Sequence, residues 1–473
     1  MWLFPFLLLL ACSREDPPPL VPLHLEPKPA PAVVLITWDT VRDDHVGSAR
    51  GATNQTPVFD GLASEGVRFM QTRTVAPETL PAHASLHTGL FPAAHGARNN
   101  GGFQVSSDVT TLAEMMTEQG YRSGAFVSAP VLSRATGLDR GFEKYDDHIP
   151  YGGTGHVVPE RDGYLTVKKA IQWMDSLPPQ DPVFIWIHLF DAHRPWTPPK
   201  QLRDASPGDL YRAEIAHVDN QTGVFMDALE ECGRKPQSLV VVTSDHGEGL
   251  GEHGESTHAW FAYESTIRVP LMMWWGEEHS MGFTRGLQIL GPASLVDIVP
   301  TLAEIEGIDT QATDGISLLD GIENGTLAQR ALPFESLAPA CDYSTAPLFG
   351  VVDEQSRAWI DLPQPELFAL DVDPDQTQNL YSENDAAEAL SQFQRFDRSW
   401  NMPCDQSLSI DRVAELEALG YLQDVVDDSY GQYTDPKDLI ELYELLSLND
   451  GQLTQEQALE KGLEMETRFG MLP

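Results

Sequence analysis

Several acidic and histidine side chains stand directly behind apolar runs that have the composition of buried strands. A short apolar run bounded by polar loops is typical of a strand in a parallel sheet. Ligands of open α/β sheets bind at the carboxyl ends of the strands. The carboxylates and imidazoles that would gather there are suitable ligands for a divalent metal ion. These residues are Asp39, Asp191, His193, Asp245 and His246.

The segment from 245 to 258 gives the strongest metal signal. Asp245 and His246 are adjacent at a strand end, and His253 and His258 follow in a glycine-rich loop. A solvated acidic loop would account for the glutamates of this segment, but not for three histidines so close together.

Two other candidates are weaker when each is taken alone. Asp191 and His193 alternate along the chain, so an extended backbone would place both on one side. Such Asp-x-His pairs are common without a metal. Asp39 by itself would suit a helix or turn cap equally well.

Thr79 carries a hydroxyl group in a position suited to a nucleophile. Pro77 and Pro81 flank it, and residues 82–87 have helical composition, so we expect Thr79 in the turn just before a helix. Free N–H groups and the helix dipole favour an anion there. A metal that lowers the pKa of the hydroxyl would make it a nucleophile. The alternative is an ordinary threonine N-cap.

The elements that must position these residues alternate along the chain. Strands are expected at residues 33–38, 123–127, 183–189, 238–244 and 267–273. Helices are expected at residues 56–66, 82–87, 111–120, 164–177, 213–231 and 295–304. This alternation predicts an α/β fold with a parallel sheet.

Length and charge limit the possible functions. A chain of 473 residues suits one large α/β core with a smaller companion. With 71 acidic against 30 basic residues the formal charge is -41, which argues against binding of nucleic acid or of an anionic membrane surface. An anionic substrate would need local positive charge, and a bound metal supplies it compactly.

The N-terminus resembles a bacterial lipoprotein signal. Residues 1–11 are apolar and too short to span a bilayer, and Leu-Leu-Ala precedes Cys12. Cys12 would be lipidated, and the proline-rich residues 13–31 would form a tether. No Lys or Arg precedes the apolar run, so a plain cleaved signal or a mis-assigned start remain alternatives. We therefore expect a lipid-anchored protein of the bacterial cell envelope, otherwise a secreted one, with no other membrane contact.

The cysteines and the C-terminal tail give little information about function. Four cysteines are too few for a disulfide scaffold, and one bridge, for example between Cys341 and Cys404, is possible. Amphipathic helices are expected at residues 436–446 and 456–469, and the tail is interpreted as a helical cap or an interaction segment.

Six segments in order resemble the sulfatase-like branch of the alkaline phosphatase superfamily. They are ITWDTVRDDHVG, TPVFDGLASEGVRF, TLPAHASLHTGLFPAAHG, ATGLDRGFEKYDD, TSDHGEGLGEHG and YESTIRVPLMM. Residues 366–380 resemble the C-terminal signature of such enzymes, and residues 412–422 a segment that follows it in bacterial members. The resemblance implies a catalytic core at 32–310 with a doubly wound, mostly parallel sheet flanked by helices. It also implies a smaller C-terminal sheet subdomain at 311–404 and a helical tail at 405–473.

The resemblance also implies roles for single residues. Asp39, Asp245 and His246 would be metal ligands, and Thr79 would be the nucleophile with its oxygen also on the metal. Asn100, or the adjacent Asn99, would bind a non-bridging oxygen of the substrate, and His83 would also contact the substrate. His258 matches a histidine of phosphoethanolamine-type transferases. Asp191 and His193 lie where members keep further metal or phosphate ligands, with His188 a weaker candidate. A second metal near Asp191, His193 and His258 would stabilise the leaving oxygen.

The nucleophile segment departs from the sulfatase pattern. Sulfatases need Cys or Ser in C-x-P-x-R, which is oxidised to formylglycine, whereas this chain has Thr79-Leu80-Pro81-Ala82-His83. Threonine cannot become formylglycine, the supporting arginine is His83, and Ala259 stands where sulfatases carry a substrate-binding lysine. The segment resembles nucleotide pyrophosphatase/phosphodiesterases, which use an unmodified threonine.

Four functions are open on these grounds. The favoured one is a hydrolase of phosphate diesters or phosphonate esters that acts through a phospho-Thr79 intermediate. The others are an envelope phospho-head-group transferase onto lipid or sugar, a sulfuric ester hydrolase and a non-catalytic binding lipoprotein. Asp, His and Thr ligands favour zinc or manganese, as one ion or two. The oligomeric state is not determined by the sequence.

Overall fold

A computed structural model describes residues 31–47, 55–149, 160–279, 282, 284–343, 345–399, 434–441 and 443. Cys12, the tether, Cys404 and the helix expected at 456–469 lie outside these residues. No helix in the described part of the chain combines the length and the apolar character needed to cross a membrane. Cys232 is a free thiol, whereas Cys341 is disulfide-bonded.

An eight-stranded sheet forms the centre of the molecule. In chain order its strands are β1 (Ala32–Trp38), β2 (Val67–Arg73), β3 (Arg122–Phe126), β4 (Lys144–Asp146), β5 (Val183–Leu189), β6 (Ser238–Ser244), β7 (Leu271–Trp275) and β8 (Leu287–Ser294). Their order across the sheet is β4-β3-β5-β1-β6-β7-β2-β8. Only β7 runs antiparallel to both of its neighbours, β6 and β2. The prediction of a mostly parallel, doubly wound sheet is therefore confirmed.

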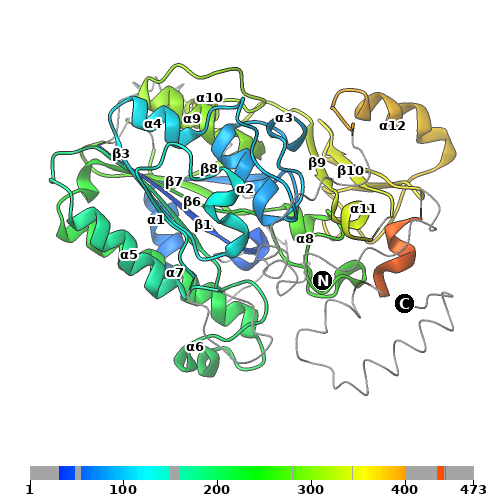
Figure 1. Cartoon of the computed structure of the whole chain (residues 1–473). Coiled ribbons are helices and arrows are strands. Elements are labelled where there is room, and N and C mark those ends of the chain that lie inside the picture. Colours follow the sequence, from blue (N-terminus) through cyan, green and yellow to red (C-terminus); the bar gives the residue numbers. More distant parts are fainter. Residues whose placement is uncertain are drawn as a thin grey trace, which may run out of the picture.

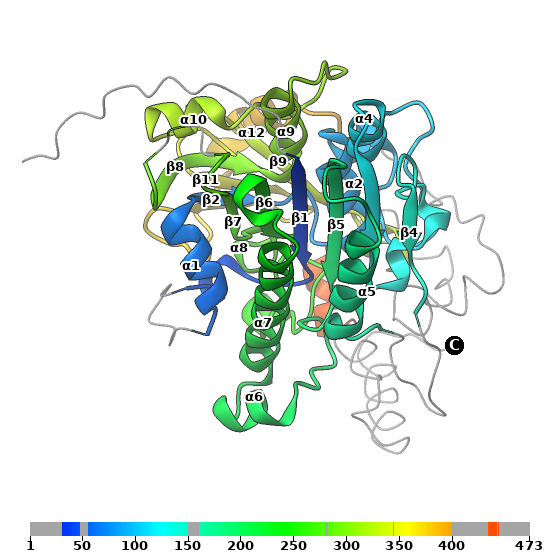
Figure 2. The same cartoon turned by 90° about the vertical axis from the view of Figure 1, so that its left-hand side faces the viewer.

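Helices cover both faces of this sheet (Figures 1 and 2). On one face lie α1 (Pro57–Glu65), α5 (Gly163–Asp175) and α7 (Leu210–Glu231), whose apolar residues share a core with the sheet. On the other face lie α2 (Thr79–Thr88), α4 (Leu112–Glu118) and α9 (Ile298–Glu306). Short helices α3 (Pro92–His95), α6 (Lys200–Ala205), α8 (Glu264–Ile267) and α10 (Leu319–Asn324) complete this part.

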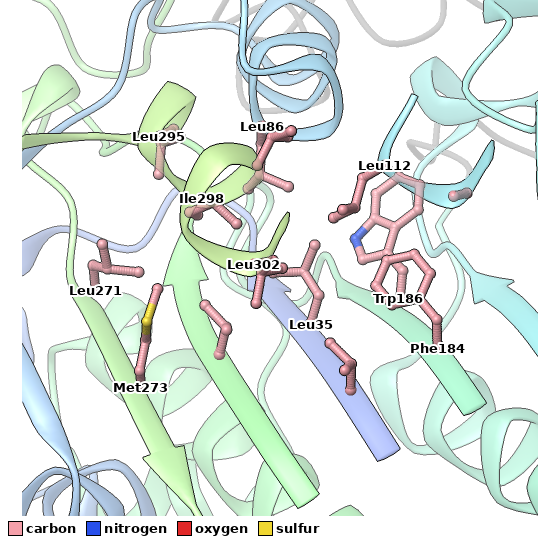
Figure 3. Packing of buried hydrophobic residues seen from close by; sticks show 14 of the residues in the cluster. Leu35, Leu86, Leu112, Phe184, Trp186, Leu271, Met273, Leu295, Ile298 and Leu302 are labelled. Carbon is pink, nitrogen blue, oxygen red and sulfur yellow. The ribbon is translucent and has the colours of Figure 1, made fainter. Parts of the chain in front are cut away.

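Alternation of side chains along β1 explains why both faces need cover. Leu35 belongs to the core beneath α2, α4 and α9, while its neighbours Val34 and Ile36 belong to the core beneath α1, α5 and α7. Figure 3 shows Leu35 beside Leu302 and Ile298 of the α9 side, with Trp186 nearby. A central parallel strand with apolar side chains on both faces is buried throughout.

A second, antiparallel sheet follows the core in the sequence, at the right of Figure 1. Its strands are β9 (Leu332–Ser336), β10 (Leu348–Val352), β11 (Arg357–Asp361) and β12 (Glu366–Ala369), in the order β12-β11-β10-β9. Helices α11 (Ala338–Tyr343) and α12 (Ala386–Phe393) accompany it. The expected smaller C-terminal sheet is thus present.

Some boundaries differ from the sequence expectations. Helix α2 begins at Thr79 itself, with Glu78 as its N-cap. The strand expected at 267–273 is shorter, because residues 264–267 form α8 and β7 starts only after Pro270. In the tail, the described part of the helix expected at 436–446 begins as a 3-10 turn at Pro436–Leu439.

Candidate active site

Asp39 and Asp245 occupy equivalent places at the ends of two neighbouring parallel strands. Trp38 of β1 pairs with Ser244 of β6, so the two acids that follow lie side by side, and both are fully buried. The Thr40 N–H donates to Asp245 Oδ1 over 3.2 Å. Thr40 has a φ of 58°, which is unusual for a β-branched residue. Such strain is retained where the surrounding structure fixes a functional geometry.

His188 of β5 holds the carboxylate of Asp39 from the other side. Its Nε2 lies 3.1 Å from Asp39 Oδ2, and the Ser128 N–H points at its Nδ1 over 3.4 Å. Because Nδ1 is the acceptor, Nε2 carries the proton and donates to Asp39. The sequence ranked His188 below Asp191, whereas the structure places it in direct contact with Asp39.

Thr79 is the first residue of α2 and faces the two strand ends. Its Oγ1 lies 3.5 Å from Asp39 Oδ2 and 3.4 Å from His246 Nε2, and the residue is fully buried. The hydroxyl therefore stands at the N-terminus of a ten-residue helix, where backbone N–H groups and the dipole favour negative charge.

Asn100, rather than Asn99, is built into this helix start. Asn100 Oδ1 accepts from the Leu80 N–H over 2.8 Å, and the Asn100 N–H donates to Glu78 over 3.0 Å. The Asn100 Nδ2 is buried without a hydrogen-bond partner among the described residues. The Asn99 side chain instead bonds the Gly101 N–H and Asp342. Asn100 is thus the residue with a donor left for a substrate oxygen.

His83 was expected to contact substrate, and its burial disagrees with that role. It is fully buried one turn after Thr79, and its Nδ1 donates to the Thr79 carbonyl over 2.7 Å. The Thr37 hydroxyl lies 3.1 Å from its Nε2. Both ring nitrogens are therefore used inside the protein. His83 therefore fixes the backbone of Thr79.

Three buried histidine rings lie next to one another beside Thr79. His246 and His258 lie 4.5 Å apart between ring centroids, and His258 and His193 lie 5.0 Å apart. The His246 Nδ1 donates to the Gly247 carbonyl over 2.9 Å, which directs Nε2 towards Thr79. The Nδ1 of His258 bonds the buried carboxylate of Glu248 over 3.0 Å. The sequence does not identify Glu248 as a site residue, because its glycine-rich loop has the composition of a solvated acidic segment. Only its position two residues after His246 could have indicated a role in the site.

Burial shifts the protonation of these groups. Burial, and then the charge of Glu248, raises the pKa of Asp39, and burial with the charge of Asp39 raises the pKa of Asp245. Burial lowers the pKa of His258 to about 3 and that of His246 well below its usual value. The imidazoles are thus neutral, as metal ligands must be, and the raised pKa values of the two acids reflect burial and negative charge that a divalent cation would offset.

Unpaired atoms mark where such a cation fits. Asp39 Oδ1 and Asp245 Oδ2 are buried and have no hydrogen-bond partner among the described residues. Ligand atoms of Asp39, Asp245 and His246 all lie within 4.8 Å of one another. A buried carboxylate oxygen without a donor is costly unless a cation neutralises it, so these three residues fit a metal ion.

Asp191 does not join this group, contrary to the expectation that it faces the same side as His193. The extended strand β5 ends at Leu189, and the His193 N–H bonds the Phe190 carbonyl across a turn. Asp191 instead lies 3.5 Å from His217 of α7, while the His193 ring stacks on Phe190 near His258. His253 also points away and stacks on Tyr263.

The tail residues contact the loop that carries His258. The Tyr443 hydroxyl donates to the His258 carbonyl over 2.7 Å, and its ring stacks on Trp260 at 4.5 Å. The Trp260 indole N–H donates to the Pro436 carbonyl over 3.0 Å. The described tail therefore supports one wall of the site.

The sulfatase family model matches residues 31–308. The chain belongs to the sulfatase family. The arylsulfatase K of Mus musculus is 23% identical over 75% of this chain and 76% of its own length. The arylsulfatase of Clostridium perfringens is 24% identical over 62% of this chain and 78% of its own length. The crystal structure of the phosphonate monoester hydrolase of Agrobacterium radiobacter superposes with a TM-score of 0.61 at 21% identity, covering 78% and 94% of the two chains. Members of this family depend on a divalent metal, and this sulfatase-family protein has residues that could hold one.

Proposed function

We propose that this sulfatase-family hydrolase cleaves phosphate diesters or phosphonate esters through a covalent phospho-Thr79 intermediate. The observation that carries the proposal is the unmodified hydroxyl of Thr79 at the start of α2, 3.5 Å from Asp39 and 3.4 Å from His246. A threonine cannot be oxidised to formylglycine, so the residue must act as an alcohol.

The chemistry of a threonyl ester favours phosphorus over sulfur. A formylglycine hydrate carries two hydroxyl groups on one carbon, and the second can expel a bound sulfate by breaking the C–O bond. Thr79 has a single hydroxyl, so its ester is released only when water attacks the phosphorus or sulfur atom. Phosphate esters of an alcohol nucleophile turn over in this way in the phosphodiesterases that this segment resembles.

The protein's own groups have distinct tasks in this reaction. In the first step a bond forms between Thr79 Oγ and phosphorus and the bond to the leaving oxygen breaks, while the hydroxyl proton passes to His246 Nε2 at 3.4 Å or to Asp39 Oδ2 at 3.5 Å. Asn100 Nδ2 donates to a non-bridging oxygen, and its orientation is fixed because Oδ1 is bonded to Leu80. His193 and His258 are buried, neutral imidazoles next to His246, so the leaving oxygen takes its proton from water.

A divalent ion held by Asp39, Asp245 and His246, which we propose to be zinc or manganese, would supply positive charge that lowers the pKa of the Thr79 hydroxyl and offsets the charge of the substrate. The backbone N–H groups at the start of α2 add to this field. Stabilisation of charge that develops in the transition state is usually the largest catalytic term.

A second candidate, sulfate-ester hydrolysis, is favoured by the names of the relatives, because the mouse and Clostridium proteins are arylsulfatases. The phosphonate monoester hydrolase among the structural neighbours favours the first candidate. Both use the same residues here, so the choice depends on whether the enzyme attacks phosphorus or sulfur.

The test is an ester panel on purified metal-loaded protein. Bis-p-nitrophenyl phosphate, p-nitrophenyl phenylphosphonate, p-nitrophenyl phosphate and p-nitrophenyl sulfate are compared for wild type, Thr79→Val and Thr88→Val. Thr88 is a buried threonine on the same helix that bonds only its own helix backbone and Leu90, and it serves as the matched control.

We expect the diester or the phosphonate to be the best substrate and Thr79→Val to lose at least ~10³-fold in kcat/KM, with Thr88→Val near wild type. Acid quenching during turnover should leave phosphate on the peptide that contains Thr79, detected by mass spectrometry. A preference for the sulfate ester would establish the second candidate instead. Full activity of Thr79→Val would refute both.

The place of action is a separate proposal that rests on the sequence around Cys12. We propose that the protein is anchored to the bacterial cell envelope by lipid on Cys12. Labelled palmitate should enter the wild-type protein and not Cys12→Ser, and equal labelling of the two would refute the anchor.

A further inference from the structure

A second group of metal-ligating side chains lies away from Thr79, where α5, α7 and the loop after β5 meet. Helices α5 and α7 pack side by side next to β5 (Figure 2). Asp162 is the N-cap of α5, Asp191 follows β5, and His217 lies on α7. One ligand atom from each of these three residues lies within 4.8 Å of the other two.

Two buried polar atoms of this group have no hydrogen-bond partner among the described residues. They are Asp191 Oδ2 and His217 Nε2. Both side chains are about nine-tenths buried, with 10% of their side-chain surface exposed. The other oxygen of Asp191 is fixed by the Gly163 N–H over 2.9 Å, so Oδ2 is held in a defined direction. A buried acceptor and a buried imidazole nitrogen left unpaired point to a missing ligand.

The distances fit a shared ion better than a direct bond. His217 Nε2 lies 3.5 Å from Asp191 Oδ1 and 3.9 Å from Asp162 Oδ1. A charged hydrogen bond would bring these atoms to about 2.7–2.9 Å. Ligands that share a tetrahedral ion at ~2.1 Å are about 3.4 Å apart, by the geometry of the tetrahedron. The three groups are therefore spaced as ligands around one ion.

The backbone at Gly163 leaves space for the carboxylate of Asp191 to approach the start of α5. A Cβ atom at Gly163 would lie 2.5 Å from Asp191 Oδ2, so a larger residue at 163 would displace this oxygen. Four carboxyl groups also lie close to one another here. Burial, and then the charge of Asp191, raises the pKa of both Glu160 and Glu214 to about 8. Among the described residues no arginine or lysine pairs with these four carboxylates.

We propose that Asp162, Asp191 and His217 form a second divalent-cation site, separate from the site at Thr79. One imidazole with carboxylate ligands selects a first-row transition ion such as Mn²⁺ or Zn²⁺ over Ca²⁺, which takes oxygen ligands. The exposed side of Asp162 leaves room for water to complete the coordination. None of its ligands belongs to the group formed by Asp39, Asp245 and His246.

The site has a consequence for the loop that carries His193. Asp191 and His193 are two residues apart, on either side of a turn that points one towards α7 and the other towards His258. An ion at Asp191 would fix this turn to α5 and α7 and thereby hold the His193 ring. The proposed cation is thus a positioning element for a residue of the active site.

The experiment measures Mn²⁺ binding in a protein that lacks the other site. In the Asp39→Ala/Asp245→Ala background, calorimetry and Mn²⁺ electron paramagnetic resonance are recorded for the parent, Asp162→Asn, His217→Gln and Asp227→Asn. Asp227 is an exposed acid on the same helix α7 and is the matched control for loss of one negative charge. Circular dichroism verifies that each protein is folded.

We expect one Mn²⁺ per chain in the parent and in Asp227→Asn, with at least ~10-fold weaker binding in Asp162→Asn and His217→Gln. A nitrogen hyperfine coupling should be present in the parent and absent in His217→Gln. Asp162 is largely exposed, so its variant tests the site even if His217→Gln does not fold. Absence of saturable binding in the parent, or equal binding by Asp162→Asn and the control, overturns the proposal. Because the background lacks both carboxylate ligands of the catalytic metal, the result is independent of the proposed reaction.

Discussion

His188 should determine how tightly the active-site metal is held, although it lies behind a ligand. Its Nε2–H donates to Asp39 Oδ2 over 3.1 Å, and both side chains are fully buried. Burial lowers the pKa of His188 to about 3, which favours the neutral ring that donates from Nε2. Replacement by leucine removes the donor while filling most of the space.

The size of the effect follows from this one bond. A hydrogen bond to a charged acceptor contributes about 1.5–3 kcal/mol. Each ~1.4 kcal/mol corresponds to a factor of ten in an equilibrium constant. His188→Leu should therefore lower the affinity for the metal by roughly 10- to 100-fold, which is the range found when hydrogen-bond partners of metal ligands are replaced in other proteins. His188→Gln, which keeps a donor, should recover most of this loss.

The assay is the metal concentration that gives half of full activity after removal of metal by a chelator. This readout reports the catalytic ion even if a second ion binds elsewhere. His87 is the matched control, because it is also buried and neutral, packs on the same Trp186, and both its ring nitrogens lack partners among the described residues. Equal half-activating concentrations for His188→Leu and His87→Leu would refute the reasoning, as would a failure of glutamine to rescue.

Two further predictions concern neighbouring groups. Asn100→Asp keeps the oxygen that accepts from the Leu80 N–H but loses the Nδ2 donor. Its kcat/KM should therefore fall about 10²–10³-fold, while the melting temperature changes little. A fall in stability without a fall in kcat/KM would contradict the proposal that Asn100 donates to the substrate. Burial opposes ionisation of Asp44, but hydrogen bonds from His45 and Arg42 hold its pKa below the usual range. The contribution of ionised Asp44 to the stability of the folded protein is therefore complete above the pKa of an aspartate in the unfolded chain, about 3.9, and is lost as the pH falls below that value. In Asp44→Asn the free energy of unfolding, measured by urea titration, should fall less steeply between about pH 5 and pH 2 than in wild type. Parallel curves for the variant and wild type would show that Asp44 does not contribute to the pH dependence of stability.

Local pattern was sufficient to predict much of the fold. The apolar runs before Asp39 and Asp245 are β1 and β6, and the two residues meet because parallel strands paired in register end at one edge. The nucleophile candidate at a helix start was also readable, since prolines around Thr79 restrict the chain there. These inferences depend only on strand periodicity, on helix-start chemistry and on the resemblance of short motifs.

Contacts between distant segments decided the rest. Asp191 and His193 have the spacing of a ligand pair, yet the turn after Leu189 sends them to different groups, and no local signal marks where a strand stops. Glu248 is charged and lies in a polar loop, but the fold buries it against His258.

The sequence by itself determined the sheet, the family and the atoms available for chemistry, because these depend on residue type and on spacing along one segment. Only the tertiary structure decided which histidine supports Asp39, which asparagine keeps a donor, and that Tyr443 reaches the loop of His258. The physical reason is that a hydrogen bond between residues 149 positions apart depends on where two whole strands lie, and neither segment encodes that alone.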